Sequence, residues 1–275
     1  MVHFKMSDFK RISNEEALDL IQNASLLELG KLSSNRKEEL HPKKTTTFVV
    51  DRNINYTNIC WVDCKFCAFY RHAKDEDAYI LTYEEIDKKI DELLEIGGTQ
   101  ILFQGGVHPK LKIDFYEDLV EHIHNKYPTI TIHGFSAIEI DYIARLSKIS
   151  YQEVLAKLKA KGLASIPGAG AEILNDDVRD IIAPKKLDTK DWLEVHRQAH
   201  LLDIKSTATM MFGTVETDEQ IIDHWDKIRQ LQDETGGFRA YIMWSFSICT
   251  YKNSPKAAKY SSQSSNRYLR TSWSC

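Results

Sequence analysis

Short stretches rich in β-branched and aromatic residues alternate along this chain with longer stretches of helical periodicity. The β-type runs read TTTFVV, TQILFQ, TITIHGF, LASIPG, KSTATMMF and RAYIMWSF. Helical periodicity lies between them, near residues 83–96, 115–126, 151–161, 190–202 and 218–234. Strands that alternate with helices form parallel βαβ units with right-handed crossovers. The pattern therefore predicts an α/β fold built on a parallel sheet.

Six such strands, with glycine and polar residues after their ends, favour a (β/α)6 barrel, complete or partial. In a barrel of this kind the reactive groups lie at the carboxyl ends of the strands. A doubly wound open sheet is the alternative, but no G-x-G-x-x-G motif follows the first strand, TTTFVV. Four capping boxes mark helix starts, at Ser13–Glu16, Thr82–Glu85, Ser150–Glu153 and Thr217–Gln220.

These signals divide the chain into three parts. Residues 1–44 form an N-terminal helical region, with helix expected over 13–40, and residues 45–248 form the barrel. Residues 249–275 break the pattern, because they contain five Lys/Arg, seven Ser and no Asp/Glu, without visible periodicity. We interpret this segment as an irregular basic tail, from a truncated or disturbed C-terminal region. A nucleic-acid-binding arm is the alternative.

Composition argues against several classes of protein. The net charge of −4 and pI near 6.2 give no reason to expect a nucleic-acid partner. No apolar run approaches the roughly 20 residues of a membrane span, and the N-terminus lacks the apolar core of a signal peptide. We therefore expect a cytoplasmic protein, in a compartment where clustered thiols stay reduced.

Three of the five cysteines, Cys60, Cys64 and Cys67, are spaced C-x3-C-x2-C directly after the first strand. A disulfide is disfavoured by the reducing compartment and the odd number of thiols. Structural zinc normally takes four ligands in paired knuckles, although His72 or Cys249 could supply a fourth. A [4Fe–4S] cluster fits better, because thiolates are its usual ligands. Three cysteines would then leave one iron open to substrate or cofactor.

The C-x3-C-x-aromatic-C pattern, with Phe66 as the aromatic residue, resembles the signature of the radical S-adenosylmethionine (SAM) superfamily. Further stretches resemble the dehypoxanthine futalosine cyclase family of menaquinone biosynthesis, over residues 11 to 247. They are VDRNINYTNICWVDCKFCAFYR, FQGGVHP, IHGFSAIEI, IPGAGAEIL, WLEVHRQAH and TATMMFGTVET. Aminofutalosine synthase and the deazaflavin-cofactor synthase subunit share parts of these motifs. A catalytically inactive or zinc-binding barrel is the alternative outside the superfamily.

The resemblance implies two cofactors, a [4Fe–4S] cluster bound by Cys60, Cys64 and Cys67, and SAM bound through the open iron. Cleavage of SAM would yield a 5′-deoxyadenosyl radical that takes hydrogen from the ribose C4′ of dehypoxanthine futalosine. The ribose carbon would then bond to the substrate's own benzoate ring, and loss of an electron and a proton would restore aromaticity. The implied partners are this nucleoside and a low-potential electron donor, flavodoxin- or ferredoxin-like, with no nucleic acid and no membrane.

Other residues receive roles from the same resemblance. Phe66 would lie against the adenine of SAM rather than serve only as a core aromatic. The segment Gln104, Gly105 and Gly106 would meet the methionine end of SAM; otherwise it is a strand-to-helix turn. The family often has an acidic residue after two glycines, but here Val107 follows.

Two residues are candidates for acid–base chemistry. Glu172, in GAGAE, would hydrogen-bond the SAM ribose or remove a proton, or else complement the dipole of a following helix. His133 closes the third strand, so we expect it near the barrel mouth as a base or substrate contact. A hydrogen-bonded core histidine is the competing interpretation.

Overall fold

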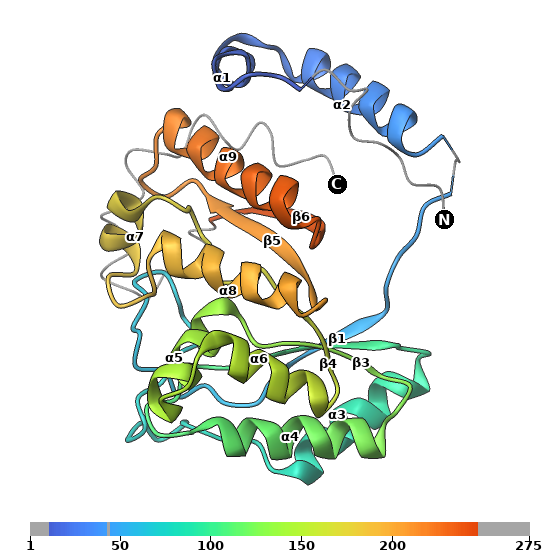
Figure 1. The fold of residues 1–275 in the computed structure, drawn as a ribbon, viewed down its shortest axis with the longest axis vertical. Coiled ribbons are helices and arrows are strands. Elements are labelled where there is room, and N and C mark those ends of the chain that lie inside the picture. The colour runs from blue at the N-terminus through green and yellow to red at the C-terminus, as the bar shows by residue number, and fades with distance from the viewer. Residues whose placement is uncertain (1–10, 43–44, 247–275) are drawn as a thin grey trace.

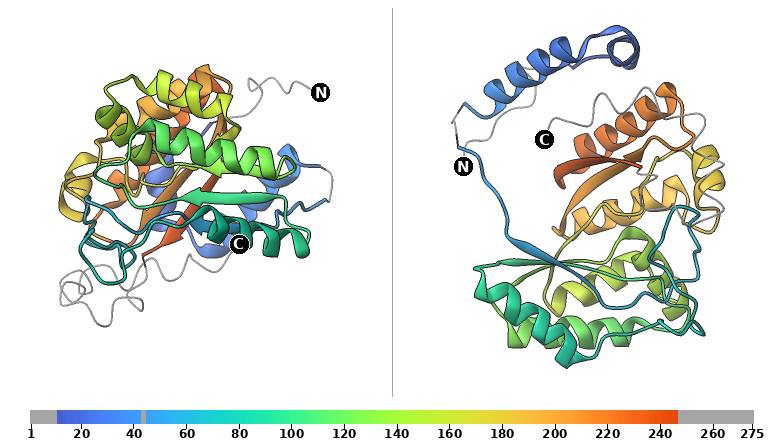
Figure 2. Two further views of the ribbon diagram at one scale, coloured as in Figure 1. Left: turned by 90° about the horizontal axis from the view of Figure 1, so that it is seen from below. Right: turned by 180° about the vertical axis from the view of Figure 1, so that it is seen from behind.

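The computed structural model describes residues 11–42 and 45–246, so the proposed tail over 249–275 lies outside the described residues. Its centre is a six-stranded sheet in the order β1-β2-β3-β4-β5-β6, with every neighbouring pair parallel. The strands are β1 (Asp51–Asn55), β2 (Gln100–Gln104), β3 (Thr131–Gly134), β4 (Leu163–Ile166), β5 (Lys205–Phe212) and β6 (Phe238–Ser245). The sheet curls into a half-barrel with helices along its outer side (Figures 1 and 2). The expected partial barrel is confirmed.

Helices follow each of the first five strands and cover the sheet. They are α3 (Tyr83–Glu95), α4 (Ile113–Lys126), α5 (Ala137–Ser147), α6 (Tyr151–Ala160), α7 (Asp176–Ile182), α8 (Thr189–Leu201) and α9 (Asp218–Thr235). All four expected capping boxes are present. A further capping box, Ser25–Glu28, begins α2 (Leu26–Leu40) and was not predicted.

The sequence did not predict α5 and α7. α5 is buried on most of its surface, including Glu139 and Asp141, so it lacks the polar face that helical periodicity requires. α7 has only seven residues, which is too short for a periodic signal.

The first strand is displaced from the expected position. TTTFVV, residues 45–50, has no regular structure, and Phe48 within it is 88% exposed. The strand is instead DRNIN, which pairs with β2 from Asp51↔Gln100 to Asn55↔Gln104. Of these five residues only Ile54 is buried, so the strand is polar and β-propensity gave the wrong segment.

An aromatic cluster lies beneath the carboxyl ends of β1 and β2. Tyr56, Phe103, Tyr116 and Phe135 are all buried, and the ring centroids of Tyr56 lie 5.2–5.9 Å from the other three. Aromatic pairs at these separations stabilise a core beyond their buried area. The cluster therefore provides a rigid base for the loops that follow β1 and β2.

The N-terminal helices α1 (Asn14–Asn23) and α2 confirm the expected helical region (Figure 1). α1 lies against α9, where Arg229 donates hydrogen bonds to Ile12 and Asn14. An apolar cavity of about 490 Å³ lies between these helices, β5 and β6. β6 ends the sheet and exposes apolar side chains, as expected, at Tyr241, Ile242, Met243 and Trp244. Within the described ranges no helix combines the length and apolarity needed to cross a membrane.

Candidate active site

The three clustered cysteines lie on the long loop between β1 and α3. Cys60, Cys64 and Cys67 are half-buried, and all three are free thiols. The loop is tied to its surroundings by main-chain hydrogen bonds: Trp61 donates to Val107 (3.2 Å), after β2, and Lys65 donates to Ile182 (2.9 Å), the last residue of α7. The loop therefore spans the carboxyl ends of the strands, beside α7 (Figure 1).

The donor set fits a [4Fe–4S] cluster. Burial raises the pKa of the Cys64 thiol to about 11, and the neighbouring Cys67 and Cys60 add to this, while the positive charge of Lys186 opposes it. The thiols are thus close enough to influence one another. Among the described residues no three His, Cys, Asp or Glu side chains gather tightly enough to hold a single metal ion. A cluster does not require such a group, because each cysteine binds a different iron.

The diglycine segment after β2 packs directly on the cysteine loop. A Cβ on Gly105 would lie 2.6 Å from the Tyr56 ring, and a Cβ on Gly106 would lie 2.4 Å from the carbonyl oxygen of Ile59. It would also lie 3.0 Å from the Cβ of Cys60. Only glycine allows this approach. The structure therefore brings the predicted segment Gln104–Gly106 against the first cysteine.

Glu139 holds this segment in place, and sequence reasoning missed it. Its Oε1 accepts hydrogen bonds from the main-chain nitrogen of Gly105 (3.0 Å) and the Tyr56 hydroxyl (2.5 Å). Its Oε2 accepts from the nitrogen (2.7 Å) and hydroxyl (2.5 Å) of Ser136. Burial raises the pKa of Glu139, although these hydrogen bonds oppose the shift. The Ser136-x-x-Glu139 spacing, a capping-box pattern, was the available signal.

Glu172 lies at the carboxyl end of β5 in a left-handed backbone conformation, with φ of 47°. Its main-chain oxygen accepts from Met211 (3.0 Å), one residue before the end of that strand. Its Oε1 forms an ion pair with Lys186 Nζ at 2.5 Å, in side chains that are only 6% and 7% exposed. Its Oε2 is buried and has no hydrogen-bond partner among the described residues.

Lys186 connects this carboxylate to the cysteine loop, and it was also missed. Its Nζ lies 5.1 Å from the centroid of the Phe66 ring. Burial would lower the pKa of Lys186, but attraction from Cys64 and Glu172 outweighs it, and the pKa is raised. The ammonium is therefore charged. Phe66, Lys186 and Glu172 form one continuous group beside the cysteines.

His133 lies apart from this group. Its Nδ1 is 2.7 Å from Ser165 Oγ, which also accepts from Arg239 (2.8 Å). Ser165 pairs with Lys205, the first residue of β5, whereas Glu172 lies near that strand's other end. Burial and the charge of Arg239 lower the pKa of His133 to about 4, so the ring is neutral at pH 7. A role for His133 in the reaction stays a prediction.

Known proteins resemble this chain in sequence. It is 42% identical over 239 residues to the cyclic dehypoxanthine futalosine synthase of Streptomyces coelicolor, a match that covers 86% of this chain and 60% of that protein. It is 40% identical over 242 residues to the aminodeoxyfutalosine synthase of Thermus thermophilus, covering 88% and 65%. The 5-amino-6-(D-ribitylamino)uracil–L-tyrosine 4-hydroxyphenyl transferase of Methanocaldococcus jannaschii is also 40% identical over 242 residues, covering 86% and 67%. The matches thus span about 60–67% of these relatives.

Solved structures share the fold. The FeFe-hydrogenase maturase HydG from Carboxydothermus hydrogenoformans superposes with a TM-score of 0.69 at 19% identity, covering 86% of this chain and 54% of that one. Methylornithine synthase gives 0.65 at 15% identity, covering 86% and 65%. A family model described as the radical SAM superfamily matches residues 54–228, which include the cysteines, the diglycine segment and Glu172. Members of that superfamily use a [4Fe–4S] cluster and SAM. The chain belongs to the radical SAM superfamily.

Proposed function

We propose that this enzyme cyclises dehypoxanthine futalosine to its cyclic (spiro) form in menaquinone biosynthesis. The observation that carries the proposal is the convergence of the cysteine loop, the diglycine segment and the Glu172–Lys186 pair at one end of the half-barrel. The choice of substrate is supported by the 42% identity to the Streptomyces coelicolor synthase. The 40% identities to the Thermus thermophilus synthase and to the transferase make those two activities the alternatives.

The cofactors would be held by residues that the structure brings together. Cys60, Cys64 and Cys67 would bind the cluster, and Phe66 would lie against the adenine of SAM. Gln104–Gly106 would meet the methionine end of SAM, where the close backbone approach leaves room for it. When bound, the two cofactors supply a 5′-deoxyadenosyl radical that removes hydrogen from the substrate ribose.

Glu172 has one oxygen committed to Lys186 and a second one without a partner among the described residues. The Lys186 ammonium keeps the carboxylate ionised, because protonation would leave a buried positive charge unpaired. The unpartnered oxygen can therefore accept a hydrogen bond from a ribose hydroxyl, or a proton that the substrate loses. His133 is neutral and can accept a proton, but it lies deeper along the sheet.

The reaction also needs partners. We propose a low-potential flavodoxin- or ferredoxin-like electron donor, and a cytoplasmic site of action where the thiols stay reduced. We propose neither nucleic acid nor membrane as a partner, in line with the acidic pI.

The test is anaerobic reconstitution with iron and sulfide, followed by incubation with SAM, a reductant and each candidate substrate in turn. We expect 5′-deoxyadenosine to form together with a cyclised product only when dehypoxanthine futalosine is present. If that nucleoside remains unchanged while a substrate of either alternative activity is consumed, the cyclase proposal is excluded. A protein that takes up zinc and no iron or sulfide would instead support the non-catalytic metal-binding barrel.

A further inference from the structure

Arg179 is a buried arginine whose guanidinium bonds to main-chain carbonyl groups. The residue is 3% exposed, and the carboxylate of Asp176 is 4.0 Å from its Nε, beyond hydrogen-bond distance. Nη1 donates to Gly170 (3.2 Å) and Ala171 (2.5 Å), while Nε and Nη2 donate to Leu187 (3.2 and 2.5 Å). Burying a guanidinium without a close carboxylate is unfavourable, so these contacts require an explanation.

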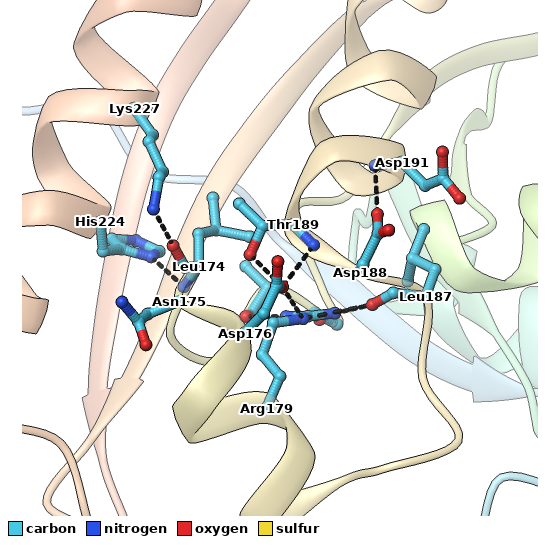
Figure 3. A network of polar contacts seen from close by, with 12 residues as sticks. Leu174, Asn175, Asp176, Arg179, Leu187, Asp188, Thr189, Asp191, His224 and Lys227 are labelled. Carbon is cyan, nitrogen blue, oxygen red and sulfur yellow. Dashed lines mark hydrogen bonds and ion pairs between the residues drawn. The ribbon is translucent and has the colours of Figure 1, made fainter.

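The carbonyls that Arg179 binds flank the two members of the buried ion pair. Ala171 directly precedes Glu172, and Leu187 directly follows Lys186. Figure 3 shows the guanidinium between α7 and the chain at Leu187. One side chain thus joins the two segments that carry the carboxylate and the ammonium. Because Glu172 has a left-handed backbone conformation, its orientation depends on contacts of this kind.

Two other anchors hold the same segments from outside, as Figure 3 shows. Asp176 Oδ1 accepts hydrogen bonds from the nitrogen (2.8 Å) and hydroxyl (2.6 Å) of Thr189, which joins the start of α7 to the start of α8. On α9, Lys227 donates to the carbonyl of Leu174 (2.8 Å), and His224 Nδ1 accepts from its nitrogen (2.9 Å). These anchors fix the ends of the two segments, whereas only Arg179 bonds to the residues adjoining Glu172 and Lys186.

We propose that Arg179 is a positioning residue that sets the geometry of the Glu172–Lys186 pair and, through it, the affinity for SAM. Arg179 acts through main-chain carbonyls rather than by contact with SAM or the cluster. This inference rests on the proposed function only in assuming that SAM binds beside Glu172; it is independent of which nucleoside is the substrate.

The test measures SAM affinity by equilibrium dialysis with reconstituted protein, without nucleoside substrate. We expect Arg179→Met to keep its iron and sulfide but to bind SAM at least about fivefold more weakly, in the range of coupling between residues that share a network. The change that SAM causes in the electron paramagnetic resonance spectrum of the reduced cluster should then need correspondingly more SAM. Lys227→Met, which removes a contact to the same loop at Leu174, is the matched control and should bind SAM as the wild type does.

A double-mutant cycle separates positioning from general loss of structure. If Arg179 acts through Glu172, Arg179→Met should weaken SAM binding little further in a Glu172→Gln background. Additive losses, an unchanged affinity in Arg179→Met, or an equal loss in Lys227→Met would overturn the inference. If Arg179→Met is insoluble, Arg179→Lys is used in the same cycle, since its single ammonium can reach one set of carbonyls but not both. A wild-type protein that binds no SAM overturns this inference and the proposed function together, whereas a cyclase-inactive wild type that binds SAM removes only the proposed substrate.

Discussion

Lys186 Nζ and Glu172 Oε1 lie 2.5 Å apart, in side chains that are almost fully removed from solvent. The two residues are 14 positions apart in sequence, on either side of α7, and neither belongs to the cysteine motif. Their contact, together with the Lys186–Phe66 contact, extends the site from the cysteine loop to the carboxyl end of β5. A buried charge pair of this kind makes definite demands on both partners.

Replacement of Lys186 by Met should destabilise the protein strongly. The substitution keeps most of the side-chain volume but leaves the Glu172 carboxylate buried without a counter-charge, which typically costs about 3–5 kcal/mol. Urea denaturation of the wild type and of Lys186→Met, at equal cluster content, measures this difference.

The adjacent Lys185 is a matched control. It also forms an ion pair, with Asp63, but its side chain is 47% exposed. Exposed pairs contribute at most about 1 kcal/mol, so Lys185→Met should have a much smaller effect. Equal losses of stability in the two variants would contradict the special position of Lys186.

Two glycine substitutions should have opposite effects. Gly106→Ala would force a Cβ against the Ile59 carbonyl and Cys60, so the cysteine loop must shift. We expect this variant to incorporate less iron and sulfide than the wild type. Gly30 lies inside α2 with nothing within 4 Å of an added Cβ, so Gly30→Ala should stabilise that helix by about 0.5–1 kcal/mol and leave iron content unchanged. Iron and sulfide analysis with thermal unfolding distinguishes the two outcomes; normal cluster content in Gly106→Ala would argue against this packing as a requirement.

Cys64→Ala should abolish cluster incorporation, because two thiolates cannot replace the three-ligand set. The visible absorbance of the reconstituted protein and its iron and sulfide content measure the effect. Cys249→Ala removes a cysteine outside the motif and should retain the cluster. Full SAM cleavage by Cys64→Ala would show that the ligand assignment is wrong.

The sequence predicted the barrel because alternation of strands and helices is a local property of the chain. It placed the first strand wrongly, since TTTFVV has the stronger β-propensity but DRNIN is the segment that pairs with β2. Propensity reports fit to a half-buried surface, and here the sheet's inner side accepts polar residues. The buried helix α5 was missed for a related reason: complete enclosure removes the amphipathic pattern on which helix prediction depends.

The candidate site was predictable where its residues are adjacent in sequence. Cys60, Cys64, Cys67 and the diglycine segment carry local spacing, whereas Glu139 and Lys186 join the site only through contacts made by folding. A lysine and a glutamate within otherwise ordinary helical stretches give no signal of burial. His133 shows the converse, because a position near a strand end did not bring it beside the cysteines.

Acid should destabilise the protein through buried histidines. Burial lowers the pKa of His133 and of His200 to about 4, and that of His224 to about 3. An unfolded histidine titrates near 6.5, so between pH 4 and 6.5 the unfolded chain binds protons that the folded chain excludes. The free energy of unfolding is therefore complete above pH 6.5 and falls as the pH falls.

Each of these histidines should contribute a slope of up to about 1.4 kcal/mol per pH unit in the free energy of unfolding between pH 4.5 and 6. His200 is the best probe, because its two ring nitrogens hydrogen-bond Thr235 (2.6 Å) and Ser206 (2.7 Å) on the outer side of the sheet, away from the cysteine loop. We expect His200→Gln, which keeps polar atoms at that position but does not titrate, to lower the slope by about one histidine's share. Urea unfolding at half-unit pH steps measures both slopes. Parallel curves for the two proteins would mean that His200 is protonated to the same extent in the folded and unfolded chains, contrary to the burial that the fold imposes.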